Sequence, residues 1–120
     1  MNERVTKLVK MSLVFHNLNK VVEHDLGLSL VQYHLLVHLK SRPGISPQSL
    51  AKIAGMHPST LTQSMKRLGK RDFLFVGEDP KDSRKKMLTL TFSGNQAIDR
   101  FETGIDSLLT SEELGVSDST

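Results

Sequence analysis

The first part of the chain carries apolar residues at helical spacing. The segment from Val5 to Leu26 predicts an amphipathic helix, because its main apolar positions stand three or four residues apart: Leu8, Met11, Phe15, Leu18 and Val22. Val14 and Val21 widen this apolar stripe beyond what one neighbouring helix covers. We therefore expect burial on two sides, within the chain and across a dimer, and Gly27 ends the helix.

Three shorter helices follow. The segment 30–40 is apolar almost all the way round, so it should lie near the centre of the domain, with Ser29 as its cap. Segment 46–55 has Ser46 as cap and Pro47 at the first helical position, and we expect its inward residues to be Leu50, Ile53 and Ala54.

The next helix, within MHPSTLTQSMKRLGKRD, has a mixed character. Leu61, Met65 and Leu68 mark its buried stripe, and Pro58 and Gly69 frame it. Its other positions are polar or basic: Ser59, Thr60, Thr62, Gln63, Lys66 and Arg67. Two short helices separated by three or four residues, the second polar on its outer side, are typical of a helix-turn-helix.

The pattern then changes to strands. FLFVGE and MLTLTF have strand composition, and the eight residues between them, DPKDSRKK at 79–86, predict a charged hairpin loop. A last amphipathic helix follows from about residue 92, capped by Thr91. The predicted fold is mainly α with a small β-hairpin wing, a winged helix-turn-helix in a single domain. Its core is 28–91, its dimerisation helices are 1–26 and 92–110, and 111–120 is a loose tail.

Charge is concentrated in the middle of the chain. From Lys40 to Lys86 there are eleven basic residues against four acidic ones, although the net charge is only +3. After Arg100 there are five acidic residues and no basic one. A basic middle with an acidic end predicts a surface that meets a polyanion.

Composition excludes several classes of function. The 120 residues contain no cysteine, which removes disulfides and thiolate chemistry, and no long apolar segment predicts a membrane contact or a secretion signal. We expect a cytoplasmic protein. No glycine-rich phosphate loop and no nucleophile–base pattern is present, so we expect no enzyme activity and no cofactor.

Double-stranded DNA is the predicted partner. A recognition helix fits the major groove, where Ser59, Thr60, Thr62 and Gln63 supply short polar groups and one amide suited to adenine. Phosphate contacts are expected from Lys66 and Arg67, and from the wing residues Arg84, Lys85 and Lys86. Arg84 suits a narrow minor groove, and Asp79 and Asp82 brace the wing loop.

Three segments resemble the MarR family of bacterial winged-helix regulators: LSLVQYHLLVHL, SPQSLAKIAGMHPSTLTQSMKRLGKRDFL and DPKDSRKKMLTLTFSG. The resemblance covers roughly residues 28 to 101. It implies a homodimeric transcription factor on a pseudo-palindrome, often a repressor released by a small-molecule effector. It also implies that Asp82 and Arg84 are the wing acid and the wing arginine. Many members have arginine where Gln63 stands, and most end in two helices where this chain has one.

The histidines admit several interpretations. His34 and His38 stand four apart, a spacing that can hold one metal ion, but no third ligand is fixed by the sequence and we predict no metal site. By the resemblance, His16, Tyr33, His34 and His38 line an effector pocket. Alternatively, His34 and His38 are polar residues on the exposed side of a core helix, and Tyr33 is a packing residue whose hydroxyl finds a partner. His57 either faces phosphate or ends its turn.

The rival to DNA binding is a winged helix that binds an acidic protein partner. Such a module has no need for a polar recognition helix, a basic helix end and an arginine-bearing wing on one side. Because the sequence places all three together, we favour sequence-specific DNA binding.

Overall fold

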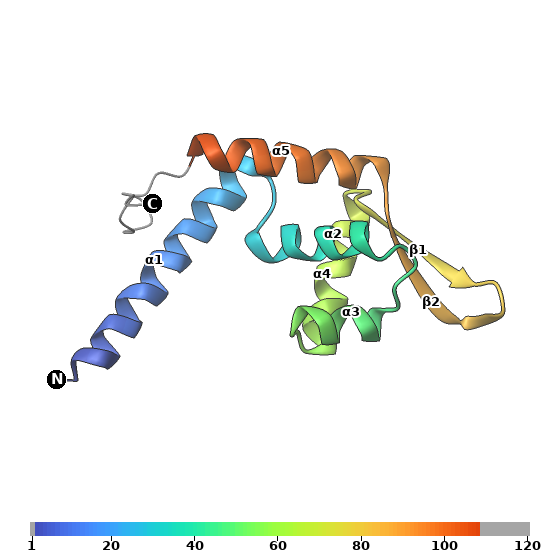
Figure 1. Cartoon of the computed structure of the whole chain (residues 1–120), viewed down its shortest axis with the longest axis horizontal. Coiled ribbons are helices and arrows are strands. Elements are labelled where there is room, and N and C mark those ends of the chain that lie inside the picture. Colours follow the sequence, from blue (N-terminus) through green and yellow to red (C-terminus); the bar gives the residue numbers. More distant parts are fainter. Residues whose placement is uncertain (1, 109–120) are drawn as a thin grey trace. The chain divides into compact units, whose positions relative to one another are not determined.

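A computed structural model of the chain describes residues 2–108. In chain order it contains α1 (Glu3–Leu26), α2 (Leu30–Ser41), α3 (Pro47–Ala54), α4 (Pro58–Lys70), β1 (Leu74–Asp79), β2 (Asp82–Leu90) and α5 (Phe92–Leu108) (Figure 1). The predicted fold class, mainly helical with a two-stranded antiparallel hairpin, is confirmed. The end of the predicted last helix at 109–110 and the predicted loose tail at 111–120 lie outside the described residues.

The described residues form two compact units. One consists of 2–30 with 101–108, and the other of 31–100. The second unit holds most of α2, all of α3 and α4, the hairpin and the start of α5. It is the unit that carries every residue expected to contact DNA.

Local signals explain where the helices of the second unit begin and end. The Ser46 hydroxyl accepts a hydrogen bond from the Ser49 N–H at 3.1 Å, and Pro47 occupies the first turn of α3, as predicted. Gly55 ends α3 in the left-handed conformation, with a φ of 67°. The helix α4 runs one residue past Gly69 and ends at Lys70.

Leucines from four elements form the core of this unit. Each is at most 1% exposed, and they come from α2, α3, α4 and β2: Leu35, Leu36, Leu39, Leu50, Leu61, Leu68 and Leu88. The central position expected for α2 is therefore confirmed. One expected inward residue is wrong: Ile53 is 37% exposed, whereas Ala51 is only 3% exposed. The short helix turns Ala51, one residue after Leu50, to the core in its place.

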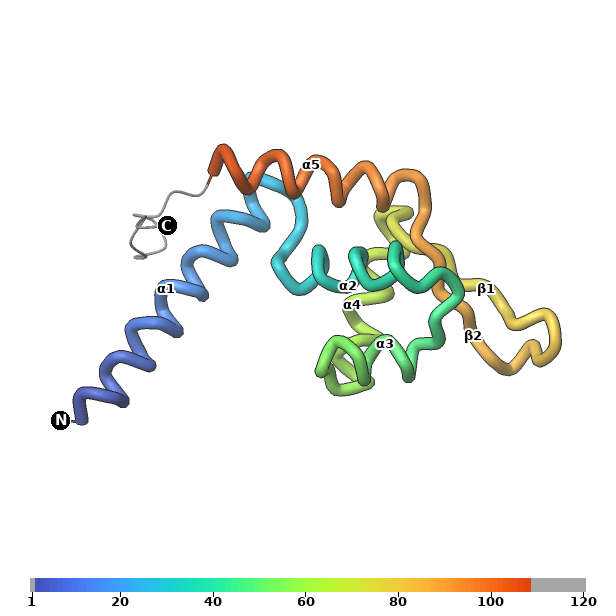
Figure 2. The backbone as a smooth tube through the Cα atoms, in the orientation of Figure 1, coloured from blue at the N-terminus to red at the C-terminus, as the bar shows by residue number. Residues whose placement is uncertain are grey.

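The loop between α2 and α3 is joined to the hairpin. The N–H of Leu88 donates to the carbonyl of Ile45, and the N–H of Gly44 donates to the carbonyl of Leu88, each at 2.9 Å. These two bonds make an antiparallel bridge between Ile45 and Leu88. The two strands lie side by side beyond it (Figure 2), so the base of the wing is fixed to the helix-turn-helix.

The start of α5 is held against the end of α4 by a cap. The N–H of Gly94 donates to the Thr91 hydroxyl at 2.9 Å, which confirms Thr91 as the cap, and that hydroxyl itself donates to the carbonyl of Asp72. A Cβ on Gly94 would lie 2.1 Å from the carbonyl oxygen of Phe73. Only glycine allows this approach.

In the first unit, α1 is regular but mostly exposed. Asn2 caps it by accepting from the N–H groups of Arg4 and Val5, and Gly27 ends it with a φ of 77°. Val22 is fully buried. A Cβ on Gly104 of α5 would lie 2.4 Å from Leu26, which shows how closely the two helices approach.

We predict that Gly94→Ala lowers the free energy of unfolding by about 1–3 kcal/mol, because the added methyl overlaps a backbone carbonyl that cannot move away freely. Urea unfolding at a fixed protein concentration measures the change. Gly69→Ala is the matched control, since a Cβ there meets nothing within 4 Å. It should leave stability unchanged or raise it by up to about 1 kcal/mol. Equal stability of the two variants would contradict the close packing at Gly94.

Candidate nucleic-acid interface

The outer side of α4 is entirely solvent-exposed. It contains the residues that the sequence selected for DNA contact: Ser59, Thr60, Thr62, Gln63, Lys66 and Arg67. Leu61 and Leu68 hold the opposite side in the core at no more than 1% exposure. The hydroxyl of Thr62 donates to the carbonyl of Pro58 at 2.9 Å, so it faces an incoming ligand as an acceptor only.

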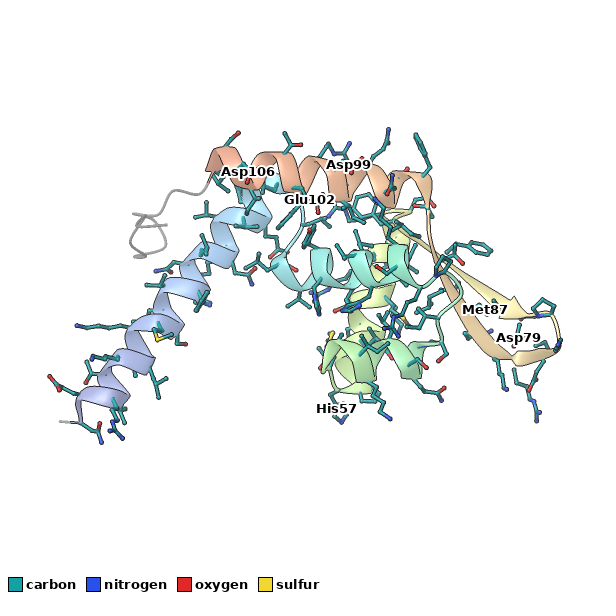
Figure 3. All side chains as sticks on the ribbon, in the orientation of Figure 1. His57, Asp79, Met87, Asp99, Glu102 and Asp106 are labelled. Atoms are coloured by element: carbon teal, nitrogen blue, oxygen red, sulfur yellow. The ribbon has the colours of Figure 1, made fainter. Side chains whose placement is uncertain are left out.

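His57 caps α4, a role that the sequence did not reveal. The Nδ1 of His57, which is labelled in Figure 3, accepts from the Ser59 N–H at 3.2 Å and lies 2.8 Å from the Ser59 hydroxyl. Histidine is not among the usual capping residues, so the signal was missed. The cap holds Ser59 in place at the first turn of the helix that is expected to enter the groove.

The wing differs from the prediction in the length of its loop. The eight residues 79–86 were expected to form the loop, but β1 extends to Asp79 and β2 begins at Asp82, so the turn contains only Pro80 and Lys81. Glu78 pairs with Lys86 and Asp79 pairs with Asp82, with an irregularity in the register between them. Ser83, Arg84 and Lys85 therefore have no partner in the register of β1 and form a bulge of β2.

Both aspartates of the wing hold its backbone. The carboxylate of Asp79, near the tip of the hairpin (Figure 3), accepts from the N–H of Lys81 at 2.8 Å. Asp82 accepts from the backbone N–H of Arg84 and from its Nε, both at 3.1 Å, and from its Nη2 at 3.2 Å. The Arg84 side chain, and next its backbone N–H, lower the pKa of the Asp82 carboxyl below its ordinary value.

Arg84 remains available to a ligand despite these bonds. Its side chain is 89% exposed while that of Asp82 is 27% exposed. The carboxylate thus fixes the direction of the guanidinium without burying it. An exposed ion pair of this kind adds little to stability, so its effect is on geometry.

A groove of about 660 Å³ separates the wing from the helix-turn-helix. Its walls come from the start of α3, the first turns of α4 and the strand β2: Ser46, Pro47, Gln48, Pro58, Leu61, Thr62, Arg84, Lys85 and Lys86. The sequence had not connected Ser46, Pro47 and Gln48 with the site, because only the folded chain brings α3 opposite the wing. The groove is positively charged, since its nine residues include three cations and no acid.

The electrostatics of the helices agree with those of the groove. Residues 47–70, which contain α3 and α4, include four basic residues and no aspartate or glutamate. Lys66 and Arg67 are exposed on α4. The three acidic residues of the hairpin make local contacts, Asp79 with Lys81, Asp82 with Arg84 and Glu78 with Lys86. A polyanion can therefore approach this side without meeting unpaired carboxylates on either helix.

The family model for MarR matches residues 28–86. These residues contain α2, α3, α4, β1 and the wing cations of β2. The chain belongs to the MarR family. It is accordingly a DNA-binding transcription regulator and not an enzyme. No curated protein gives a significant match.

Solved structures of MarR-family regulators share the fold. The PcaV regulator from Streptomyces coelicolor is 24% identical over 95% of this chain and 88% of its own, with a TM-score of 0.77. A mutant of Escherichia coli MarR, complexed with operator DNA, is 18% identical over 97% of this chain and 84% of its own, with a TM-score of 0.76.

The CouR protein is similar in two different complexes. The transcriptional repressor CouR bound to a 23-mer DNA duplex is 20% identical over 89% of this chain and 74% of its own, with a TM-score of 0.74. CouR from Rhodococcus jostii bound to p-coumaroyl-CoA is 23% identical over 88% and 75%, with a TM-score of 0.68. At these identities the likeness establishes the winged-helix fold.

A second surface of this MarR-family chain is apolar and lies on α1. Eight large apolar side chains of this helix are 40–63% exposed: Val5, Leu8, Val9, Met11, Leu13, Val14, Phe15 and Val21. Soluble proteins rarely leave so much apolar area open without a partner. Within residues 2–108, no helix is long and apolar enough to cross a membrane.

The four residues expected at an effector pocket are divided between the two units. His16 is exposed on α1, while Tyr33 is half-buried on α2. The Nε2 atoms of His34 and His38, also on α2, lie 3.2 Å apart. The pKa of His38 is lowered mainly by partial burial, and to a smaller extent by the charges of His34 and Arg42. The structure therefore brings His34 and His38 together, and the pocket as a whole stays a prediction.

We predict that Arg84→Ala raises the pKa of Asp82 toward its ordinary value, because the hydrogen bonds that favour the carboxylate are partly removed. Carbon-detected NMR of the Asp82 carboxyl during an acid titration measures this change. Lys86→Ala is the control, since Lys86 pairs instead with Glu78 at 3.7 Å. An Asp82 titration that is the same in wild type and Arg84→Ala would show that the pair does not exist in solution.

Proposed function

We propose that this MarR-family chain is a cytoplasmic homodimeric repressor that binds a pseudo-palindromic operator and is released by a small-molecule effector. The observation that carries the proposal is one exposed surface in the second unit. There Thr62 from the polar side of α4 and the cations Arg84, Lys85 and Lys86 of β2 border the same groove, and residues 47–70 contribute no acid.

Each part of this surface has a distinct role in the proposed complex. The helix α4 enters the major groove, where the amide of Gln63 pairs with a base edge while Ser59, Thr60 and Thr62 fit the groove around it. Lys66 and Arg67 neutralise phosphates, with Lys85 and Lys86 doing so from the wing. Arg84, held by Asp82, enters the adjacent minor groove.

The proposed dimer uses the apolar side of α1. In a symmetric dimer the same patch on each chain covers the other, which removes the exposed Leu8, Met11 and Phe15 from water. Two recognition helices in such a dimer address half-sites about one helical turn apart, roughly 10 base pairs between centres. CouR, described as a transcriptional repressor, supports the proposal of repression.

The proposed release by an effector rests on a relative and on side chains of this chain. CouR binds p-coumaroyl-CoA. We propose that an effector of this chain contacts Tyr33, His34 and His38, which all lie on α2 in the second unit. Binding that favours a conformation unable to reach both half-sites would lower operator affinity.

Selection from random duplex DNA with the purified chain tests the proposed function, followed by titration of the selected duplex at several salt concentrations. The proposal predicts enrichment of an inverted repeat and two chains per duplex. Enrichment of a single unrepeated half-site would refute the dimeric operator. An absence of binding at low salt would favour the rival module that binds an acidic protein partner.

We predict opposite signatures for two substitutions in the interface. Arg84→Ala weakens binding to all sequences and flattens the salt dependence by about one phosphate equivalent or less, because its contact is electrostatic. Gln63→Ala changes which base is preferred within each half-site and leaves the salt dependence unchanged. Repeating the selection and the salt titration with both variants measures this, with Lys10→Ala on α1 as control. Unchanged base preference in Gln63→Ala would remove Gln63 from sequence recognition.

We predict that Phe15→Glu weakens dimerisation by at least roughly tenfold, because the substitution places a charge in the apolar interface. Light scattering coupled to size exclusion, over a range of concentrations, measures the dissociation constant. Lys10→Glu introduces the same side chain at another exposed position of α1 and should have a much smaller effect. Dimers of equal strength in both variants would show that the apolar side of α1 is not the interface.

A further inference from the structure

Two histidines on α2 are arranged as a pair. The Nε2 atoms of His34 and His38 lie 3.2 Å apart, the ring centroids lie 4.5 Å apart, and the ring planes meet at 84°. Both residues are on successive turns of one helix. His34 is exposed and His38 is half-buried, so the pair is open to solvent on one side.

This separation is the one that a shared metal ion requires. Imidazole nitrogens bind Zn²⁺ at about 2.0–2.1 Å, so two of them at a tetrahedral angle stand roughly 3.3 Å apart. The observed 3.2 Å lies within about a tenth of an ångström of that distance. The two atoms in contact are the Nε2 of each ring. One ion bound by both nitrogens can therefore take the place of this direct contact.

We propose that His34 and His38 form a binding site for one divalent transition metal ion of the class that prefers imidazole, such as Zn²⁺ or Ni²⁺. Within residues 2–108, no third histidine, cysteine or carboxylate joins the pair to form a larger cluster. Water completes the coordination, so the site is of the open kind, with positions that a small ligand can occupy. Both ligands lie on α2 within the second unit, and the site does not rest on the proposed DNA binding.

Nearby charges affect how tightly the histidine pair binds a metal ion. Arg42 acts electrostatically on His38, and like charge opposes a bound cation. We therefore expect Arg42→Ala to bind the metal more tightly than wild type. The bound ion also joins two turns of α2 and stabilises the native state. The thermal midpoint should therefore rise with the logarithm of the metal concentration once that concentration exceeds the dissociation constant.

Isothermal titration of the full chain with Zn²⁺ tests the site. Wild type should bind one ion per chain at this site, and His34→Ala and His38→Ala should each bind at least roughly tenfold more weakly, because removal of one ligand ends chelation. Alanine favours helix more than histidine does, so both variants are expected to fold. Circular dichroism confirms this before each titration.

A variant with the same number of histidines isolates the spacing. His38→Ala combined with Lys40→His keeps two histidines on α2 but places them six residues apart, about 120° from each other around the helix axis. It should bind Zn²⁺ as weakly as His38→Ala and show no rise of the thermal midpoint with the metal. The proposed site would be contradicted if this double variant bound Zn²⁺ as tightly as wild type, or if wild type and His38→Ala bound it equally tightly.

Discussion

The bridge between Ile45 and Leu88 is the contact on which the DNA-binding unit depends. Its two backbone hydrogen bonds join the loop before α3 to β2, and the Leu88 side chain is fully buried among the leucines of the helices. Without this bridge, a two-stranded hairpin would be marginally stable by itself. With it, the cations of β2 stand at a fixed distance from α3 and α4, and the groove between them exists.

Short local interactions then direct the functional side chains. Asp82 holds Arg84, Asp79 holds the turn through Lys81, and His57 holds the first turn of α4 through Ser59. Each is exposed, so each contributes little to the free energy of folding. They restrict the conformations of these side chains before DNA binds. Less conformational freedom is then lost on binding, which lowers the entropic cost of the complex.

Much of this arrangement follows from sequence, and the exceptions have physical causes. Apolar periodicity and capping residues located five helices, and Ser46 and Thr91 cap α3 and α5 as predicted. The wing loop was overestimated because residues 79–86 are polar, whereas Lys86 and Glu78 pair across the strands. The sequence could not decide whether Ala51 or Ile53 is buried. The helix α3 has only eight residues, and a small rotation about its axis changes which residues face the core.

The candidate site shows the same division between local and long-range information. The polar and basic residues of α4 could be selected from sequence because a single helix places them on one side. Gln48 could not, since it reaches the groove only after α3 folds against the wing. The cap at His57 and the contact between His34 and His38 depend on side-chain rotamers, which residue spacing does not determine.

Hydroxyl-radical footprinting of the chain on its selected operator shows whether α4 and the wing act together from one fixed unit. We predict protection of the minor groove on the outer side of each major-groove half-site, and loss of that outer protection in Arg84→Ala with the half-sites still covered. Protection confined to the major-groove half-sites in wild type would contradict it, because the wing would then take no part in binding.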